Sequence, residues 1–386
     1  MKNLTSKEIN QIIADNWYSK KTIDIALLIG RDPSVVRNRA RQMKLKPRVI
    51  ESEDNYEVSF SKEKEKKLSK SSQTKLEEKY KFLLEKNIDL EEKLKILERS
   101  DKISTFTIKP SKSTKSEATA IVLASDWHVG ETVDPETIGG VNQYNRLIAS
   151  ARGKEFFNNT LRILKVFEKD ITIKHMVLAL LGDFITNTIH EELAETNSML
   201  PSDEIVFAQD LIASGIQHLL DNTTVDIVVP CHSGNHGRMT KKQRISSEAG
   251  NSLEFYMYQN IAWHFKGNKR IKFVIPRSYF SYIQVYDKIV RFSHGHHTQY
   301  GGGVGGITIP INKAIAQWNK TRRADIDCFG HFHQFLDGGY WICNGSMMGF
   351  NAYAESIKAG FEKPKQCFFL IDKNRGKTVV APIVFT

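Results

Sequence analysis

Five short apolar runs in the C-terminal two-thirds of the chain each end in a polar motif. The runs are four to six residues long and rich in aliphatic residues, which is typical of buried strands. They are Ala120–Ala124, Met176–Leu181, Val225–Val229, Ile289–Phe292 and Ile326–Phe329. Residues just past the end of a buried strand are held rigidly and can still face a cleft. The pattern therefore predicts a sheet-based domain with a site at its strand ends.

The five motifs supply one amide, two carboxylates and several imidazoles, and no thiolate. In chain order they are Asp126-Trp127-His128, Gly182-Asp183, Gly234-Asn235-His236, His294-Gly295-His296 and Gly330-His331-Phe332-His333. Alone, an Asp-x-His motif is more often a capped turn, and a Gly-Asp motif is ordinary turn chemistry. Five such motifs in series, each at a strand end, indicate a metal site and an enzyme.

The order of these motifs resembles the signature of the calcineurin-like metallophosphoesterase superfamily, which is D-x-H, G-D, G-N-H, a lone His and G-H-x-H. The resemblance covers roughly residues 118–386. It implies an α+β fold, a two-layer β-sandwich flanked by helices, with two divalent metal ions at one end of the sheets. It also implies hydrolysis of a phosphate ester.

The resemblance further implies a role for each motif residue. The first metal would be held by Asp126, His128, Asp183 and His333. The second would be held by Asn235, His294, His331 and the bridging Asp183. His236 would act on the scissile phosphate, and Asp183 would be essential for catalysis. Mixed oxygen and nitrogen ligation favours Mn, with Fe or Zn as alternatives, over Mg or Ca.

The physical need for such a set is independent of the family. A phosphodiester is anionic and repels hydroxide, so its hydrolysis requires positive charge near the phosphate oxygens and a nucleophile available at neutral pH. Two close divalent cations supply both, and a carboxylate shared between them reduces their mutual repulsion. Asp183 is the candidate for that shared carboxylate.

Two departures from the family bear on the substrate. Protein phosphatases of the superfamily carry one Arg shortly after G-D and another just before G-N-H. Here the first region runs from Gly182 to Asn187 without an Arg, and Ser233 precedes Gly234. Both arginines are missing, which argues against a protein phosphatase. The third motif continues with Gly237-Arg238 instead of the usual acid, so Arg238 is either a substrate-phosphate ligand or a surface cation.

Three further segments lie near the motifs. Tyr300–Gly306 contains five glycines in seven residues, which fits either a loop that lets backbone N–H groups approach an anion or a flexible connector. Ile309–Thr321 is predicted to be a helix, with Pro310 near its start. His190–Pro201 is predicted to be a polar loop.

Residues 1–50 are strongly basic, with eleven Lys and Arg against four Asp and Glu. Helical patterns occur at Ser6–Trp17, Lys21–Ile29 and Pro33–Leu45, the last after an Asp32 cap. The pattern resembles the trihelical helix-turn-helix modules of phage and bacterial regulators, which implies DNA as a partner. The alternative is a small basic bundle for protein contacts.

A Lys-, Glu- and Leu-rich segment, residues 61–100, is predicted to be a coiled coil. Leu76, Leu83, Leu90 and Leu97 recur every seventh residue as d positions, and Tyr80, Asn87 and Leu94 fall at a. A single Asn at an a position favours a parallel two-stranded homodimer. The alternative is a single solvated helix. Residues 101–117, rich in Ser, Thr and Lys, are predicted to be a linker to the metallophosphoesterase domain of residues 118–386.

The remaining composition excludes several protein classes. Four widely spaced cysteines, without a C-x-x-C motif, indicate neither a zinc knuckle nor a disulfide framework. No signal peptide or membrane-spanning run is seen, so we expect a cytoplasmic protein that does not bind a membrane.

Taken together, these features of the sequence predict a dimeric DNA nuclease of phage or bacterial DNA metabolism. The alternatives are a phosphatase or nucleotide phosphodiesterase, and a DNA-binding regulator with an inactive phosphoesterase scaffold.

Overall fold

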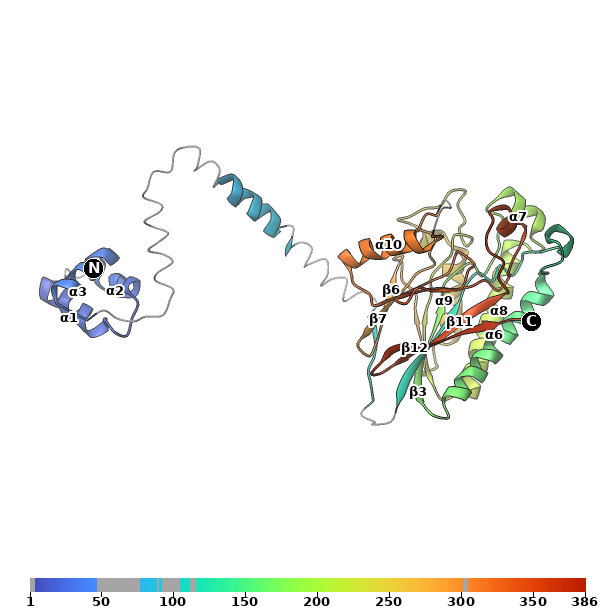
Figure 1. Cartoon of the computed structure of the whole chain (residues 1–386), viewed down its shortest axis with the longest axis horizontal. Helices are drawn as coiled ribbons and strands as arrows, with labels where there is room; N and C mark the ends of the chain where they lie inside the picture. The colour runs from blue at the N-terminus through green and yellow to red at the C-terminus, as the bar shows by residue number, and fades with distance from the viewer. Residues whose placement is uncertain (1–3, 47–76, 89, 92–104, 112–115, 301–304) are drawn as a thin grey trace. The chain divides into compact units, whose positions relative to one another are not determined.

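The computed structural model describes residues 4–46, 77–88, 90–91, 105–111, 116–300 and 305–386. The chain divides into two compact units, Met1–Glu92 and Lys93–Thr386 (Figure 1). Each unit is described by itself below.

The N-terminal unit begins with three helices, α1 (Ser6–Asn16), α2 (Thr22–Ile29) and α3 (Pro33–Gln42). Each predicted helix is confirmed to within three residues at either end. Thr5 and Glu8 form a capping box before α1, and the Asp32 side chain accepts a hydrogen bond from the Ser34 N–H at the start of α3. Gly30 ends α2 in the left-handed conformation, with φ +62°.

The three helices bury a small apolar core of their own, contributed by Ile9, Ile13, Trp17, Ile25, Ala26, Ile29, Val36 and Ala40. Of the basic residues on α3, Arg39 is engaged within the unit. Its Nη1 donates to the Ser6 carbonyl oxygen at 3.2 Å and to Asn10 Oδ1 at 2.9 Å. Arg37 and Arg41 are exposed, as is Lys44 just after the helix.

Residues 77–88 and 90–91 are helical. They include Tyr80, Leu83, Asn87 and Leu90 of the predicted seam, and all four side chains are exposed in the single chain. The other predicted seam positions, Leu76, Leu94 and Leu97, lie outside the described residues.

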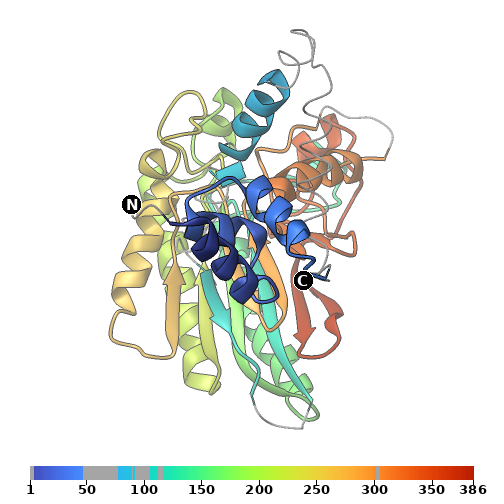
Figure 2. The same ribbon diagram turned by 90° about the vertical axis from the view of Figure 1, so that its left-hand side faces the viewer.

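The C-terminal unit contains two six-stranded mixed sheets (Figures 1 and 2). In spatial order, the first sheet comprises β1 (Thr105–Ile108), β6 (Ser281–Val285), β7 (Lys288–Phe292), β8 (Ile326–Phe329), β10 (Trp341–Cys343) and β9 (Leu336–Asp337). The second comprises β12 (Gly376–Val384), β11 (Lys365–Asp372), β2 (Glu117–Ala124), β3 (Thr172–Leu180), β4 (Asp226–Pro230) and β5 (Ile271–Val274). All five predicted strands are confirmed, as β2, β3, β4, β7 and β8.

The alternation of side chains along a strand explains how the layers are assembled. In β2, Ile121 and Leu123 point to the core between the two sheets, whereas Ala120 and Val122 belong to a second core on the other face. That second core packs under three helices, α6 (Arg146–Phe167), α8 (Pro201–Asn222) and α9 (Leu253–His264). α10 (Thr308–Thr321) packs against the first sheet, where Ile311 and Ile315 contact Phe329 and Trp341.

The architecture is therefore a two-layer β-sandwich flanked by helices, as predicted. The helix expected at Ile309–Thr321 is confirmed as α10. The remaining short elements are η1 (Pro135–Ile138), α7 (Glu191–Thr196), η2 (Ala249–Asn251) and α11 (Ala352–Ser356).

Two expectations about irregular segments were wrong in part. The predicted loop His190–Pro201 contains the helix α7, because Glu191 and Glu192 lie in a first turn where negative charge is favourable. The predicted linker 101–117 contains β1, which pairs in parallel with β6. Only two apolar residues, Phe106 and Ile108, anchor β1 to the core, too few to stand out among Ser, Thr and Lys. Gly301–Val304 of the glycine-rich segment lie outside the described residues.

No helix within the described ranges is long and apolar enough to cross a membrane. All four cysteines, Cys231, Cys328, Cys343 and Cys367, are buried free thiols.

Candidate metal centre

The sheet topology brings the five motifs to one edge of the sandwich. β2, β3 and β4 are parallel neighbours in one sheet, and β7 and β8 are parallel neighbours in the other. The carboxyl ends of parallel neighbours lie on the same side of a sheet, which is where open sheets of this kind place their ligands. Each of these five strands is followed, within four residues, by the start of one of the five motifs.

The first group of ligand atoms comes from Asp126, His128 and His333. Their ligand atoms lie within 4.8 Å of one another. His333 Nε2 is 3.4 Å from Asp126 Oδ1, and His128 Nε2 is 3.2 Å from His333 Nε2. Two imidazole nitrogens this close, beside a buried carboxylate, form a converging set of donors that suits a cation.

The second group comes from Asp183, His294 and His331, again within 4.8 Å. His294 Nε2 lies 3.0 Å from Asp183 Oδ2 and 3.2 Å from Asn235 Oδ1. The amide oxygen of Asn235 therefore joins the same group. The structure brings together all seven residues that the sequence predicted as ligands.

Asp183 links the two groups. Besides its place with His294 and His331, its carboxylate lies within 4.8 Å of ligand atoms of His128 and His236. The backbone N–H of His236 donates to Asp183 Oδ1 at 2.8 Å. This central position is the one that a bridging carboxylate requires, and the mixed carboxylate, amide and imidazole set fits two divalent metal ions.

Backbone carbonyls orient two of the imidazoles. His294 Nδ1 is 2.6 Å from the Leu181 carbonyl oxygen and donates to it, and Nε2 faces Asp183 and Asn235. His236 Nδ1 is 2.8 Å from the Thr186 carbonyl oxygen, which leaves Nε2 as the remaining ring nitrogen. Such second contacts orient ligating and catalytic histidines.

The charges in this centre are strongly coupled. Burial alone would raise the pKa of Asp183, but His294 and the other imidazoles hold that pKa well below its usual range. Burial lowers the pKa of His294, but the Asp183 carboxylate outweighs it and raises the value to about 10. For His128 and His331, burial lowers the pKa well below the usual range. The buried Asp183 anion thus favours the charged form of His294, the imidazole beside it, whereas burial favours the neutral form of His128 and His331.

Five of the predicted ligand residues have a positive φ. The values are +56° for Asp126, +46° for His128, +53° for Asp183, +72° for His331 and +55° for His333. Few non-glycine residues adopt this left-handed region, and such residues cluster at functional sites because the surrounding structure holds them there. The strained backbone turns each side chain back toward the centre just past its strand.

Glycines allow the motif loops to approach one another closely. Gly182 has φ +90°, and a Cβ on it would lie 2.2 Å from the Gly234 nitrogen. A Cβ on Gly234 would lie 1.9 Å from Asp183 Oδ1, and one on Gly330 would lie 2.4 Å from Asp126 Oδ2. The Gly in each of these motifs is required for space beside a ligand carboxylate or its loop.

A buried carboxylate that the sequence analysis missed holds two of these loops together. Glu254, near the start of α9, accepts hydrogen bonds from the backbone N–H groups of Phe184 at 2.6 Å and Gly234 at 2.7 Å. Burial, and then the charge of Asp183, raise the pKa of Glu254 to about 7. Glu204 of α8 is a second buried carboxylate that holds this loop. It accepts hydrogen bonds from the backbone N–H groups of Thr186 at 2.9 Å and Asn187 at 2.8 Å.

A buried polar network fixes the first motif in the same way. Gln366 of β11 bonds both backbone groups of Ser125, accepting from its N–H at 2.9 Å and donating to its carbonyl oxygen at 3.1 Å. Asn344 donates to Ser125 Oγ at 2.9 Å, and Ser125 Oγ donates to Asp126 Oδ2 at 2.6 Å. Such fully bonded networks rigidify a site. Nothing in the local sequence around Asn344 or Gln366 signals this role.

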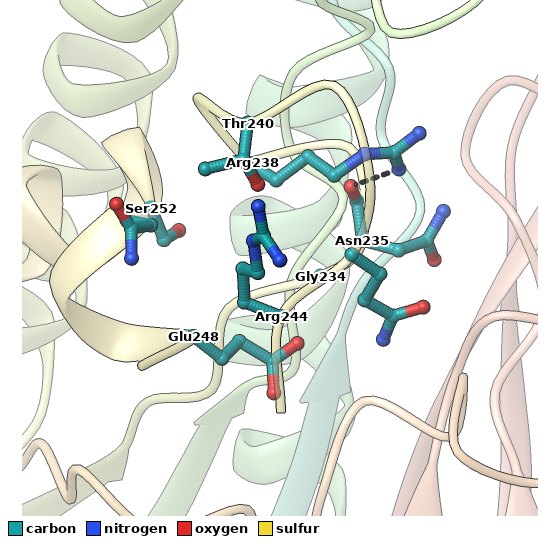
Figure 3. Close-up of a pocket in the computed structure, with 9 residues that line it drawn as sticks. Gly234, Asn235, Arg238, Thr240, Arg244, Glu248 and Ser252 are labelled. Carbon is teal, nitrogen blue, oxygen red and sulfur yellow. Dashed lines mark hydrogen bonds between the residues drawn. The ribbon is translucent and has the colours of Figure 1, made fainter. Parts of the chain in front are cut away.

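Arg238 lies beside the centre rather than on the open surface. Its Nη1 donates to the Asn235 carbonyl oxygen at 2.8 Å, and its Nε is buried with no hydrogen-bond partner in the described part of the chain. Arg238 lines a pocket together with Asn235, Arg244, Glu248 and Ser252 (Figure 3). Two guanidinium groups therefore adjoin a proposed metal ligand.

Comparison with known proteins finds similarity at the level of structure alone. No family model matches the chain, and no curated protein matches its sequence. A hypothetical protein from Pyrococcus horikoshii superposes with a TM-score of 0.36 at 11% identity, covering 69% of this chain and 89% of its own. A dimetal phosphatase from Danio rerio gives 0.33 at 10% identity, covering 69% and 99%. A predicted phosphoesterase from Streptococcus pneumoniae gives 0.28 at 10%, covering 71% and 100%. At these values, the function of this chain has to be inferred from its own residues.

Proposed function

We propose that this chain is a metal-dependent phosphodiesterase that hydrolyses DNA. The observation that carries the proposal is the place of Asp183, a buried carboxylate within ligand distance of imidazoles from both groups. A shared carboxylate of this kind is the element that a two-metal phosphoesterase needs and that a single structural metal site does not.

Seven residues would hold the metals. Asp126, His128, Asp183 and His333 would bind the first ion, and Asp183, Asn235, His294 and His331 the second, with Mn proposed and Fe or Zn as alternatives. When bound, two divalent cations offset the charge of a phosphodiester and make a nucleophile available from water at neutral pH. The buried polar contacts to Asp126 and Asp183 keep this donor set in place without the substrate.

His236 and Arg238 would act on the substrate. With its proton on Nδ1 directed to Thr186, His236 keeps Nε2 for a hydrogen bond or proton exchange with the phosphate. Arg238 has a buried Nε without a partner in the described residues, and a bound phosphate oxygen would satisfy it. In this proposal, neither residue is a metal ligand.

DNA is the proposed substrate because of where positive charge lies. In the N-terminal unit, α3 presents Arg37 and Arg41 to solvent. In the C-terminal unit, the segment after the third motif exposes Lys241, Lys242 and Arg244. Exposed basic side chains on a helix-turn-helix-like unit supply phosphate contacts for nucleic acid. This chain also lacks the two arginines that protein phosphatases of the superfamily carry beside their motifs, which argues against a protein substrate.

We also propose that the helical residues 77–88 and 90–91 pair with a second copy of the chain. The apolar residues among the described seam positions, Tyr80, Leu83 and Leu90, are 69%, 55% and 48% exposed. Apolar residues at heptad spacing are stabilised when a second helix covers them. Pairing would place two DNA-binding units in one molecule.

The test compares the full chain with a truncation lacking the first 100 residues, both loaded with Mn²⁺. The truncated protein retains the two apolar cores of the sandwich. The substrates are a bis-aryl phosphodiester, an aryl monoester, and single- and double-stranded DNA. We expect both proteins to hydrolyse the diester equally and the truncation to lose most DNA cleavage.

The salt dependence of DNA binding provides the control. Each phosphate contact releases counterions, so losing the basic unit should flatten the slope of log K against log salt. Hydrolysis of the monoester alone would indicate a phosphatase, and unchanged DNA cleavage after truncation would remove residues 1–50 from the mechanism. If the metal-loaded full-length protein hydrolysed none of these substrates, the proposal that the chain is an enzyme would be refuted.

A further inference from the structure

A third group of potential ligands lies outside the seven residues of the proposed centre. It consists of Glu248, His296 and His297, whose ligand atoms lie within 4.8 Å of one another. His296 Nε2 is 2.6 Å from Glu248 Oε1, and His297 Nε2 is 3.5 Å from Glu248 Oε2. Both imidazoles therefore face the same carboxylate.

Tyr279 holds the segment that carries the two histidines in place. Tyr279 accepts hydrogen bonds at its hydroxyl from the backbone N–H groups of Gly295 at 3.0 Å and His297 at 3.1 Å. Its ring stacks on the His297 ring with centroids 3.7 Å apart and an interplanar angle of 11°. The conformation of the segment after β7 is thus fixed by contacts other than the one to Glu248.

The group is largely enclosed by the protein. The His296 side chain is only 2% exposed, and its Nε2 contacts Glu248, whereas its Nδ1 has no hydrogen-bond partner within the described ranges. His297 Nε2 also faces Glu248, at the longer distance. Two imidazole nitrogens thus converge on one carboxylate in a largely buried setting, which is a donor set that suits a cation.

We propose that Glu248, His296 and His297 bind a third divalent cation of the zinc type. Two imidazoles and one carboxylate form the three-ligand set that Zn²⁺ takes when a fourth position stays open. Mg²⁺ and Ca²⁺ favour shells made of oxygen alone. The site is adjacent to the proposed dinuclear centre but separate from it, since the His296 ring centroid is 5.2 Å from that of His294 and 6.1 Å from that of His331.

The site joins two segments that are far apart in the sequence. Glu248 belongs to the connection between β4 and α9, whereas His296 and His297 follow β7. The same connection carries Arg244, which lines the pocket beside Asn235 and Arg238 (Figure 3). A cation at Glu248 would fix this basic connection against the end of β7 and keep Arg244 near the phosphate. Only this last consequence rests on the proposed phosphodiesterase function.

The test measures zinc content directly and does not depend on activity. The full-length protein is equilibrated with micromolar Zn²⁺, passed through a desalting column and analysed by mass spectrometry for metals. Glu248→Gln and His297→Gln should each bind one zinc ion fewer per chain than the wild type. His190→Gln, the same change at an exposed histidine outside the group, should bind as much as the wild type.

A crystal of the wild type soaked in Zn²⁺ tests the site without any variant. An anomalous difference peak bounded by Glu248, His296 and His297 is expected. The absence of that peak, or zinc content unchanged in both Gln variants, overturns the proposal. Asp183→Asn separates this outcome from failure of the dinuclear centre, because it should lose zinc from the centre and retain the ion at Glu248.

Discussion

The two units of the chain use polar residues in opposite ways. In the N-terminal unit, the core is apolar and the basic side chains of α3, except Arg39, are exposed to solvent. In the C-terminal unit, carboxylates and imidazoles are buried at strand ends and held by further buried groups such as Glu254 and Gln366. An exposed cation contributes a graded, salt-dependent share of binding, whereas a buried ligand is part of one preorganised set. Substitutions should therefore be severe in the second unit and graded in the first.

The largest effect is expected at Asp183. Asp183→Asn removes the negative charge shared by the two ligand groups, and it places an amide N–H₂ where a carboxylate oxygen faces His294 or the His236 N–H. We expect hydrolysis of the aryl diester to fall to background with any metal, and the metal content to fall below two ions per chain.

Asp170→Asn, the same change at an exposed residue of this unit, is the matched control and should keep full activity. Full activity of the wild type after removal of all metal by a chelator would contradict the assignment of Asp183.

His236 should show the next largest effect, and it tests whether the buried set contains a residue that acts on substrate. His236→Ala leaves all seven proposed ligands in place but removes the Nε2 nitrogen. Loss of a proton-transfer group lowers kcat on the order of 10²–10⁴-fold. Metal content should match the wild type, with His190→Ala as the control. If His236→Ala instead lost a metal ion, His236 would be a ligand.

Glu254 should have a smaller effect because it acts through the loops that it joins. Glu254→Gln leaves one acceptor oxygen for two backbone donors, the N–H groups of Phe184 and Gly234. Loss of such a supporting contact typically costs roughly 10–100-fold in metal affinity or activity. Isothermal titration with Mn²⁺ should show the weaker affinity, and activity should recover at saturating Mn²⁺. Glu191→Gln, at an exposed residue, should titrate like the wild type.

Features with a local pattern could be predicted from the sequence. Buried strands are short apolar runs, and the ends of α3 follow from the Asp32 cap and Pro33. The motif residues could be found because each motif begins within five residues of the end of such a run. Parallel pairing of β2, β3 and β4 then brings their ends together, which is why all seven predicted ligands converge.

Features that depend on distant residues could not be predicted. Glu254 contacts a backbone group 70 residues away, and Gln366 contacts one 241 residues away. Neither lies in a motif. Glu248 is likewise 48 positions from His296, so the third ligand group has no recognisable spacing. The positive φ of Asp126 and Asp183 is also set by surrounding structure rather than by residue type.

The smallest catalytic effect is expected from the helical residues 77–88 and 90–91, which concern assembly alone. Leu83→Lys with Leu90→Lys places charges in the predicted seam, where a parallel partner would bring like charges together. The double variant should be monomeric by light scattering at micromolar concentration, and its hydrolysis of the aryl diester should equal that of the wild type. DNA affinity should fall, because two linked binding units gain from a high effective concentration that one unit lacks. Phe82→Lys with Ile88→Lys is the matched control, since both positions are exposed but lie outside the seam. A monomeric wild type would refute the pairing, and a control pair that also became monomeric would show that the helices meet through a different face.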